Sequence, residues 1–254
     1  MKSCIIKNNY ANADKGADPM KTLSIKSTFI ILIPLIIIVG LGYRTNALGA
    51  ISCHCFNDRD YNPADRFAAD DYILATSFNS LLAKYFAVPK GQIIMLKMNE
   101  GVPEDDLLIG LKVAHTTGED VNKLLGLRRA GKTWQEVIAG MEQQDKLRND
   151  PILHGIISGV EAGQAGRDVV DEIISQFYAI PVEEITKLRK AGLSEKEITL
   201  VFILVHVSNQ KTATLLAQHN EHNKSWSEIA HNLGIEPAEA GKLIMAYPAK
   251  QINE

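Results

Sequence analysis

One stretch of this chain occurs twice, and that internal repeat limits the possible folds more than any other feature. "YFAVPKGQIIMLKMNEGVPEDDLL" (85–108) aligns with "FYAIPVEEITKLRKAGLSEKEIT" (177–199) at a shift of about 92 residues. Identical pairs continue in order through Trp134, which aligns with Trp226, to Glu136, which aligns with Glu228. Ordered identities over about 65 residues, with gaps of a single residue, indicate a tandem duplication. We therefore expect one folded unit to be present in two copies.

The repeated stretches carry the start and stop signals of helices. Three hydroxyl residues are each followed three places later by Glu, the pattern of a capping box: Thr133, Ser194 and Ser225. The apolar run "ITLVFILVHV" (198–207) would also suit a buried strand. Its counterpart at 107–116 is less β-branched, so we expect both to be buried helices. The predicted fold class is all-α.

These signals divide the chain into segments. We expect the first helical copy at 70–141, a connector with one helix at 142–165, and the second copy with a C-terminal helix at 166–254. Residues 51–69 form a separate segment that is rich in Cys, His and Asp.

Four aromatic residues are expected to serve the structure. Trp134 and Trp226 each stand at the start of a helix, where a large aromatic side chain buries much area, so we expect them in the core of each copy. His115 and His206 occupy equivalent positions in the most apolar helices. A single His on an apolar face is usually a hydrogen-bonded core residue, and we expect that here.

The N-terminus has the pattern of an export signal. Two lysines precede an uncharged apolar run at 28–43, and small residues follow at Ala47 and Ala50. This order is typical of a secretory signal peptide within residues 1–50, cleaved after Ala47 or Ala50, with Met20 as a possible true start. The alternative is an uncleaved membrane anchor at 28–43, although that run is shorter than the roughly 20 residues that span a bilayer. We expect a periplasmic or secreted protein.

Removing the signal makes the chain acidic. Residues 1–50 hold six of the 27 Lys and Arg and two of the 30 Asp and Glu, which leaves 21 basic against 28 acidic residues. A net negative surface repels the phosphate backbone, so nucleic acid is not an expected partner.

"EITKLRKAGLSEKEI" (184–198) and "KSWSEIAHNLGI" (224–235) resemble the helix-turn-helix superfamily, and the chain is similar to exported bacterial all-helical proteins with such tandem repeats. The resemblance implies DNA binding as one alternative function. A DNA reader needs a third helix that presents basic or amide side chains near its start. The segment in that place, "EPAEAGKLIMAY", offers Glu236 and Glu239 instead. This departure argues against DNA binding.

"SCHC" (52–55) is the best candidate for chemistry. Cys53 and Cys55 are the only cysteines after the predicted cleavage sites. In an oxidising compartment they can form a disulfide, or they can bind a soft metal together with His54. A lipid-modified or free thiol is the remaining alternative. The sequence names no cofactor.

Two further groups have partial metal-ligand spacing. Asp58, Asp60 and Asn62 follow the spacing of a calcium loop, but Pro63 replaces the required Gly, so we expect a turn. His219, His222 and His231 cluster in the second copy only, and we expect a solvated polar face there rather than a metal site.

No catalytic constellation is predicted, so we expect a non-enzymatic interaction or scaffold protein whose partner is another envelope protein. The alternative is a metal-binding or redox protein that uses Cys53, His54 and Cys55. Membrane contact is expected only through an uncleaved signal segment.

Measuring the intact mass of the exported protein tests the N-terminal predictions together. We expect a chain that lacks residues 1–47 or 1–50 and is lighter by two further hydrogen atoms, because Cys53 and Cys55 are oxidised. Metal analysis of the same sample separates the alternatives. Stoichiometric copper or zinc that is lost in Cys53→Ser would contradict the disulfide and favour the metal role.

Overall fold

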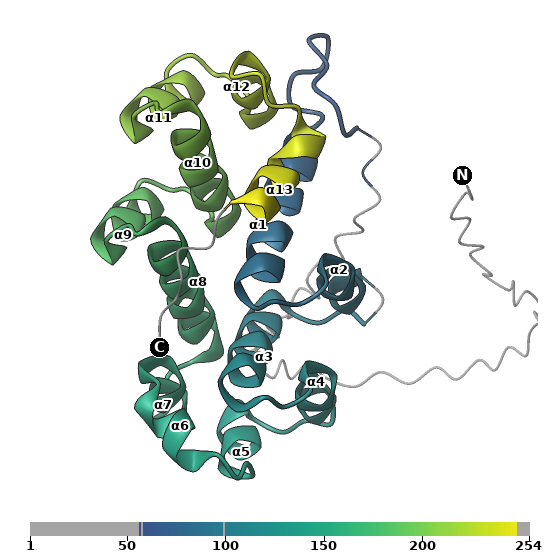
Figure 1. Ribbon diagram of the computed structural model, residues 1–254, viewed down its shortest axis with the longest axis vertical. Helices are drawn as coiled ribbons and strands as arrows, with labels where there is room; N and C mark the ends of the chain where they lie inside the picture. Colours follow the sequence, from purple (N-terminus) through teal and green to yellow (C-terminus); the bar gives the residue numbers. More distant parts are fainter. Residues whose placement is uncertain (1–55, 57, 99, 248–254) are drawn as a thin grey trace, which may run out of the picture. The chain divides into compact units, whose positions relative to one another are not determined.

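Helices joined by short turns make up the described part of the chain, and no strand occurs in it. The structure is a computed structural model that describes residues 56, 58–98 and 100–247, which all belong to one unit, residues 47–254. Its helices are α1 (Asp70–Tyr85), α2 (Lys90–Met98), α3 (Glu104–Thr117), α4 (Val121–Arg129), α5 (Trp134–Ala139), α6 (Gln144–Asn149), α7 (Pro151–Ile157), α8 (Ala162–Tyr178), α9 (Val182–Lys190), α10 (Glu195–Ser208), α11 (Thr212–Asn220), α12 (Trp226–Asn232) and α13 (Pro237–Ala246). The predicted all-α class is therefore confirmed (Figure 1).

The predicted caps begin three of these helices. The capping boxes of Thr133 and Ser194 are complete. At Ser225 only half of the box forms. The Ser225 hydroxyl accepts the N–H of Glu228 at 3.0 Å, whereas the Glu228 carboxylate bonds to Arg66 at 3.3 Å. The Glu228 carboxylate, which the sequence pattern assigns to the cap, therefore binds Arg66 in the N-terminal segment instead.

A carboxylate from the start of α1 completes the N-terminus of α12 instead. Asp70 Oδ1 accepts the N–H of Ser227 at 2.8 Å, and Asp70 Oδ2 accepts the N–H of Trp226 at 3.1 Å. The first N–H groups of a helix have no partner within it, so a carboxylate is favoured there. This bond joins the first and the last thirds of the described chain.

We call α1–α5 the first helix set and α8–α12 the second helix set. Helices in the same order in the two sets have similar lengths and begin about 92 residues apart. Helices α2 and α9 are both nine residues long and begin 92 residues apart, and α3 and α10 are both 14 residues long and begin 91 residues apart. A left-handed residue follows the first helix of each set, at Ala87 (φ 54°) and Ala179 (φ 56°). Positive φ is rare for Ala, and the two alanines that have it here are paired by the sequence alignment.

The stretch between the helix sets is more helical than the sequence suggests. Residues 142–165, expected to be a connector with one helix, contain α6, α7 and the start of α8. Asp150 starts α7 by accepting the N–H groups of Ile152 and Leu153, and Pro151 stands at the first helical position. Asp-Pro also begins turns, so this pair alone does not predict a helix start.

Each helix set places its first helix against the third helix of the other. Helix α1 packs on α10 and α3 packs on α8, so that α1 and α3 form one column beside α8 and α10 (Figure 1). Helix α13 packs along α1, and α7 packs on α8. Within α10 the residues buried by this arrangement are Ile198, Leu200, Val201, Phe202, Ile203 and Leu204. Apolar residues on every side suit a helix that has neighbours on every side.

Among the described residues no helix has the length and apolar character that a membrane span requires.

A buried lysine crosses the boundary between the helix sets. Lys112 on α3 is 5% exposed, and its Nζ lies 2.7 Å from Asp150 Oδ2 and 2.6 Å from Glu172 Oε2. Asp150 caps α7 and Glu172 belongs to α8, so one ammonium group holds three helices.

Replacing this lysine should strongly destabilise the protein. In Lys112→Met two carboxylates lose their counter-ion inside the structure, and we expect the free energy of unfolding to fall by about 3 kcal/mol. Lys123→Met is the matched control, because the Lys123–Glu119 ion pair is largely exposed and should contribute less than about 1 kcal/mol. Urea unfolding measures both. Equal losses in the two variants would contradict the role of Lys112.

Candidate functional site

The first predicted sites belong to the N-terminal segment, residues 51–69 of the sequence. Cys53, His54 and Cys55 fall outside the described residues, so their disulfide or metal site stays a prediction. Asp60 is exposed, and Asn62 Oδ1 accepts the N–H of Ala64 at 3.0 Å, which is the hydrogen bond of an Asx turn.

The predicted cluster of His219, His222 and His231 does not form a common site. His219 Nδ1 lies 2.8 Å from the carbonyl oxygen of Lys224, His231 Nδ1 lies 2.7 Å from Glu236 Oε1, and His222 is exposed. Over residues 58–98 and 100–247, no three His, Cys, Asp or Glu side chains are grouped so that they could hold a metal ion.

Both tryptophans are buried and make the same hydrogen bond. Trp134 Nε1 donates to Asp106 Oδ1 at 2.8 Å, and Trp226 Nε1 donates to Glu197 Oε1 at 2.9 Å. Burial alone would raise the pKa of Glu197, but the hydrogen bonds from the Ser194 backbone and from the indole lower it overall. These two bonds join the fifth helix of each set to its third helix.

His219 and Arg128 occupy equivalent positions and make equivalent contacts. The His219 ring stacks on Trp226 with 4.2 Å between centroids, and the Arg128 guanidinium lies 5.4 Å from the centre of the Trp134 ring. Arg128 also donates to the carbonyl of Lys132, as His219 contacts that of Lys224. His219 therefore has a structural role, in which it packs against the Trp226 ring.

The expectation for the other histidine pair was wrong. His115 and His206 are both exposed, not hydrogen-bonded core residues. They lie in the last turns of α3 and α10, beyond the buried stretches 107–113 and 198–204. His115 contacts the ring of Phe86 at 5.7 Å, and His206 contacts that of Tyr247 at 4.4 Å between centroids. The apolar sequence around them did not reveal the end of the packed region.

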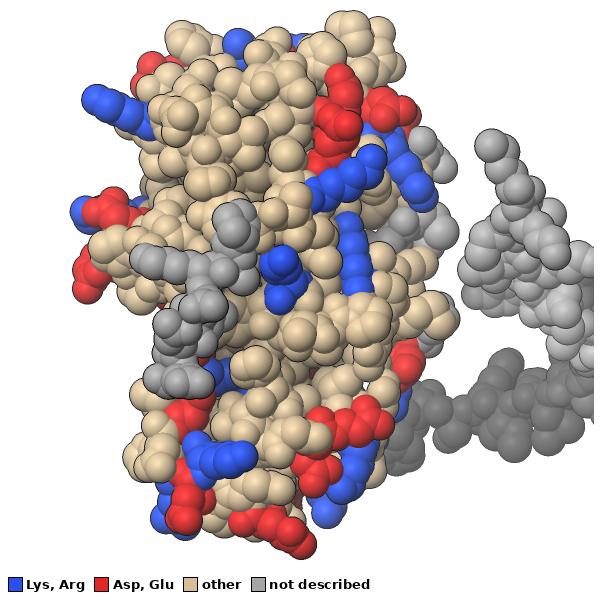
Figure 2. All heavy atoms as spheres, viewed as in Figure 1, with Lys and Arg blue, Asp and Glu red and all other residues tan. Residues whose placement is uncertain are grey.

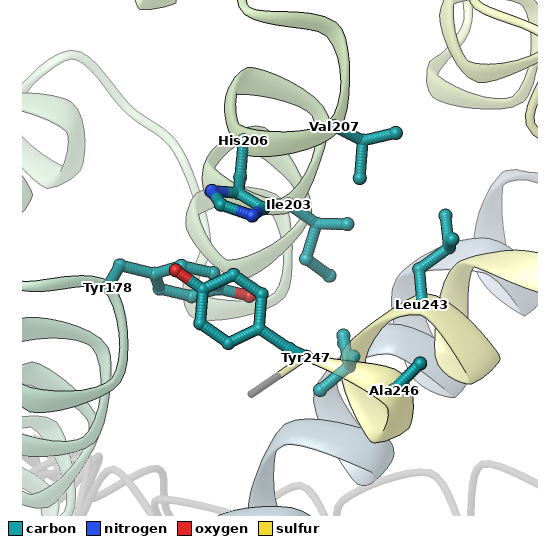
Figure 3. A pocket seen from close by; sticks show the side chains of 8 residues that line it. Tyr178, Ile203, His206, Val207, Leu243, Ala246 and Tyr247 are labelled. Carbon is teal, nitrogen blue, oxygen red and sulfur yellow. The ribbon is translucent and has the colours of Figure 1, made fainter. Parts of the chain in front are cut away.

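A cavity of about 340 Å³ opens beside His206. Figure 3 shows the rings of His206, Tyr178 and Tyr247 close together, with Ile203 and Val207 on α10 facing α13. The lining residues are Tyr178, Ile203, His206, Val207, Leu243, Ile244, Ala246 and Tyr247. We call this cavity the α10–α13 pocket. No Asp, Glu, Lys or Arg is among these described residues.

The hydroxyl of Tyr178 is the unusual group of the α10–α13 pocket. It is buried and has no hydrogen-bond partner in the described part of the chain. Burial also raises the pKa of this phenol, because the phenolate would lose its hydration. A buried hydroxyl without a partner costs free energy, so a ligand that accepts a hydrogen bond from it would be favoured.

The equivalent place in the first helix set is polar. Phe86, Lys112 and His115 stand there in place of Tyr178, Ile203 and His206. Lys112 fills this region with its two carboxylate partners, whereas Ile203 leaves an apolar wall. The sequence alignment already contained this Lys-to-Ile difference, and it was the available signal for the α10–α13 pocket.

Exchanging His219 tests the packing role of that residue. We expect His219→Arg to keep the free energy of unfolding within about 0.5 kcal/mol, because Arg makes the same two contacts in the first helix set. His219→Ala should lose about 1 kcal/mol or more, since both contacts disappear. Urea unfolding followed by tryptophan fluorescence measures both variants. A His219→Arg variant as unstable as His219→Ala would refute the equivalence.

Comparison with known protein families, with curated proteins and with solved structures gives no match to this chain.

Proposed function

We propose that this chain is an exported, non-enzymatic interaction protein, built from two copies of one helical unit, that binds an apolar side chain of another envelope protein. The α10–α13 pocket is the binding site. The observation that carries the proposal is the apolar pocket with a buried, unpaired Tyr178 hydroxyl.

Several observations support the two-copy origin. The helix sets agree in order and bounds at the shift of the sequence alignment, and the same tryptophan-to-carboxylate bond occurs in both. Their contacts are also reciprocal, since the first helix of each set packs on the third helix of the other. Reciprocal contacts are those of a two-fold pair, as a duplicated dimer-forming unit would make.

The size and chemistry of the α10–α13 pocket favour a side chain as its occupant. About 340 Å³ lies at the lower end of the range of ligand pockets, roughly 300–1,000 Å³. Val207 extends the apolar surface to solvent, where its side chain is 42% exposed. A Leu, Ile or Phe side chain of the partner fits these walls. A backbone carbonyl beside that side chain can accept a hydrogen bond from the Tyr178 hydroxyl. The export signal indicates that the partner is an envelope protein.

Photo-crosslinking in cells tests the proposal. A photo-reactive phenylalanine analogue at Val207 should give a discrete adduct, which mass spectrometry maps to an apolar residue of the partner. The matched control is the analogue at Thr116, the equivalent position on α3, where Lys112 and its partners replace the apolar wall. We expect no adduct there.

A filled pocket supplies the second control. Leu243→Trp places a larger side chain in the α10–α13 pocket and should abolish the Val207 adduct, with the circular dichroism spectrum unchanged. A synthetic peptide with the mapped residue should then bind the wild type. Its affinity for Tyr178→Phe should be about fivefold lower, because one hydrogen bond is lost. An adduct that persists in Leu243→Trp would overturn the proposal.

A further inference from the structure

Basic side chains line two adjoining cavities on another part of the surface. One, of about 270 Å³, lies beside α1 and α2, and the other, of about 580 Å³, lies between α1 and α13. The two share Tyr72, Thr76 and Lys90 as lining residues. We call them together the α1–α13 groove. In Figure 2, Lys and Arg side chains gather near the middle of the face, over the region of α1, α2 and α13.

The α1–α13 groove contains cations without carboxylate partners. Arg59, Lys90 and Lys242 line it, and no Asp or Glu does. None of these three residues takes part in the ion pairs of the described chain. Lys90 is the partly buried one of the three, and most other partly buried lysines and arginines of the described chain are in ion pairs.

Lys90 lies at the centre of the groove. Its Nζ donates to Thr76 Oγ1 at 2.6 Å, which leaves two N–H donors for another acceptor. Burial lowers the pKa of Lys90, because a partly desolvated ammonium group lacks an anion beside it. A bound anion would remove this cost.

The close approach of α13 fixes the position of the Lys90 ammonium group. A methyl carbon added at Gly241 would lie 2.6 Å from Ser80 Oγ and 3.0 Å from Lys90 Nζ. The absence of a side chain at this position therefore leaves room for the Lys90 ammonium group and for two hydroxyls, those of Thr76 and Ser80. Hydroxyl and ammonium groups thus converge where α1 and α13 meet.

We propose that the α1–α13 groove binds a phosphate group through Lys90 and Lys242, with Arg59 at its other end. Phosphate carries a charge of about −1.5 to −2 and several acceptor oxygens, so it can satisfy more than one ammonium group and a hydroxyl donor. A carboxylate carries a single charge. The phosphate can belong to a lipid headgroup or to a small soluble molecule. Met245, which is 44% exposed at the edge, offers an apolar surface beside the phosphate.

Binding measurements on the full exported protein test this site with two probes. Calorimetry uses glycerol 3-phosphate, and sedimentation uses vesicles of phosphatidylcholine with one-fifth phosphatidic acid. Lys90→Met and Lys242→Met should each weaken binding about tenfold, because each removes a charge-assisted hydrogen bond. Lys211→Met removes one exposed charge from the start of α11 and should have no effect.

The two probes distinguish the source of the phosphate. Binding of both, or of glycerol 3-phosphate alone, indicates a soluble ligand. Binding of the vesicles alone, with no binding to pure phosphatidylcholine, indicates a lipid headgroup. Absence of binding to both probes would overturn the proposal, as would equal weakening in Lys211→Met. If Lys90→Met fails to fold, the Lys242→Met variant provides the test. Lys242 is exposed, so its replacement breaks no buried contact.

Discussion

The reciprocal packing of α1 on α10 and of α3 on α8 is the constraint on which the rest of this structure depends. Helix α10 is buried along residues 198–204 and would expose the side that packs on α1 if the second helix set stood alone. Helix α3 carries a buried lysine whose carboxylate partners are on α7 and α8. Neither helix set therefore completes its own core, and the described chain should unfold as one cooperative body.

Residues that the sequence alignment pairs differ in chemistry between the two helix sets. At one pair of equivalent positions Lys112 supports an ion-pair network, whereas Ile203 forms the wall of a cavity. At another pair Arg128 and His219 each pack on a tryptophan ring, so this difference in residue type keeps the same contact. A pair of aligned residues that differ but pack alike contributes to the fold. A pair that differs in polarity marks a place where a binding function can arise.

The helices could be predicted because their signals are local. The cap at Ser194 marked the start of α10 correctly, and the less β-branched counterpart at 107–116 decided a run that also suited a strand. The candidate sites could not be predicted in the same way. Arg59 and Lys242 come from opposite ends of the described chain, and they line adjoining cavities only because α13 returns along α1. The exposure of His206 likewise depends on where the neighbours of α10 end, and no local pattern records that.

Helix α13 connects the two proposed binding sites. One side of it contributes Leu243 to the α10–α13 pocket, the other contributes Lys242 to the α1–α13 groove, and Ala246 lines both. A ligand at either site that favours a different position of α13 would change affinity at the other, and by the same factor in both directions. A ligand with equal affinity for every position of α13 would transmit nothing. Because Gly241 lies against Ser80 without room for a side chain, that helix has little freedom to move. The tight contact of α13 with α1 therefore favours independent binding at the two sites.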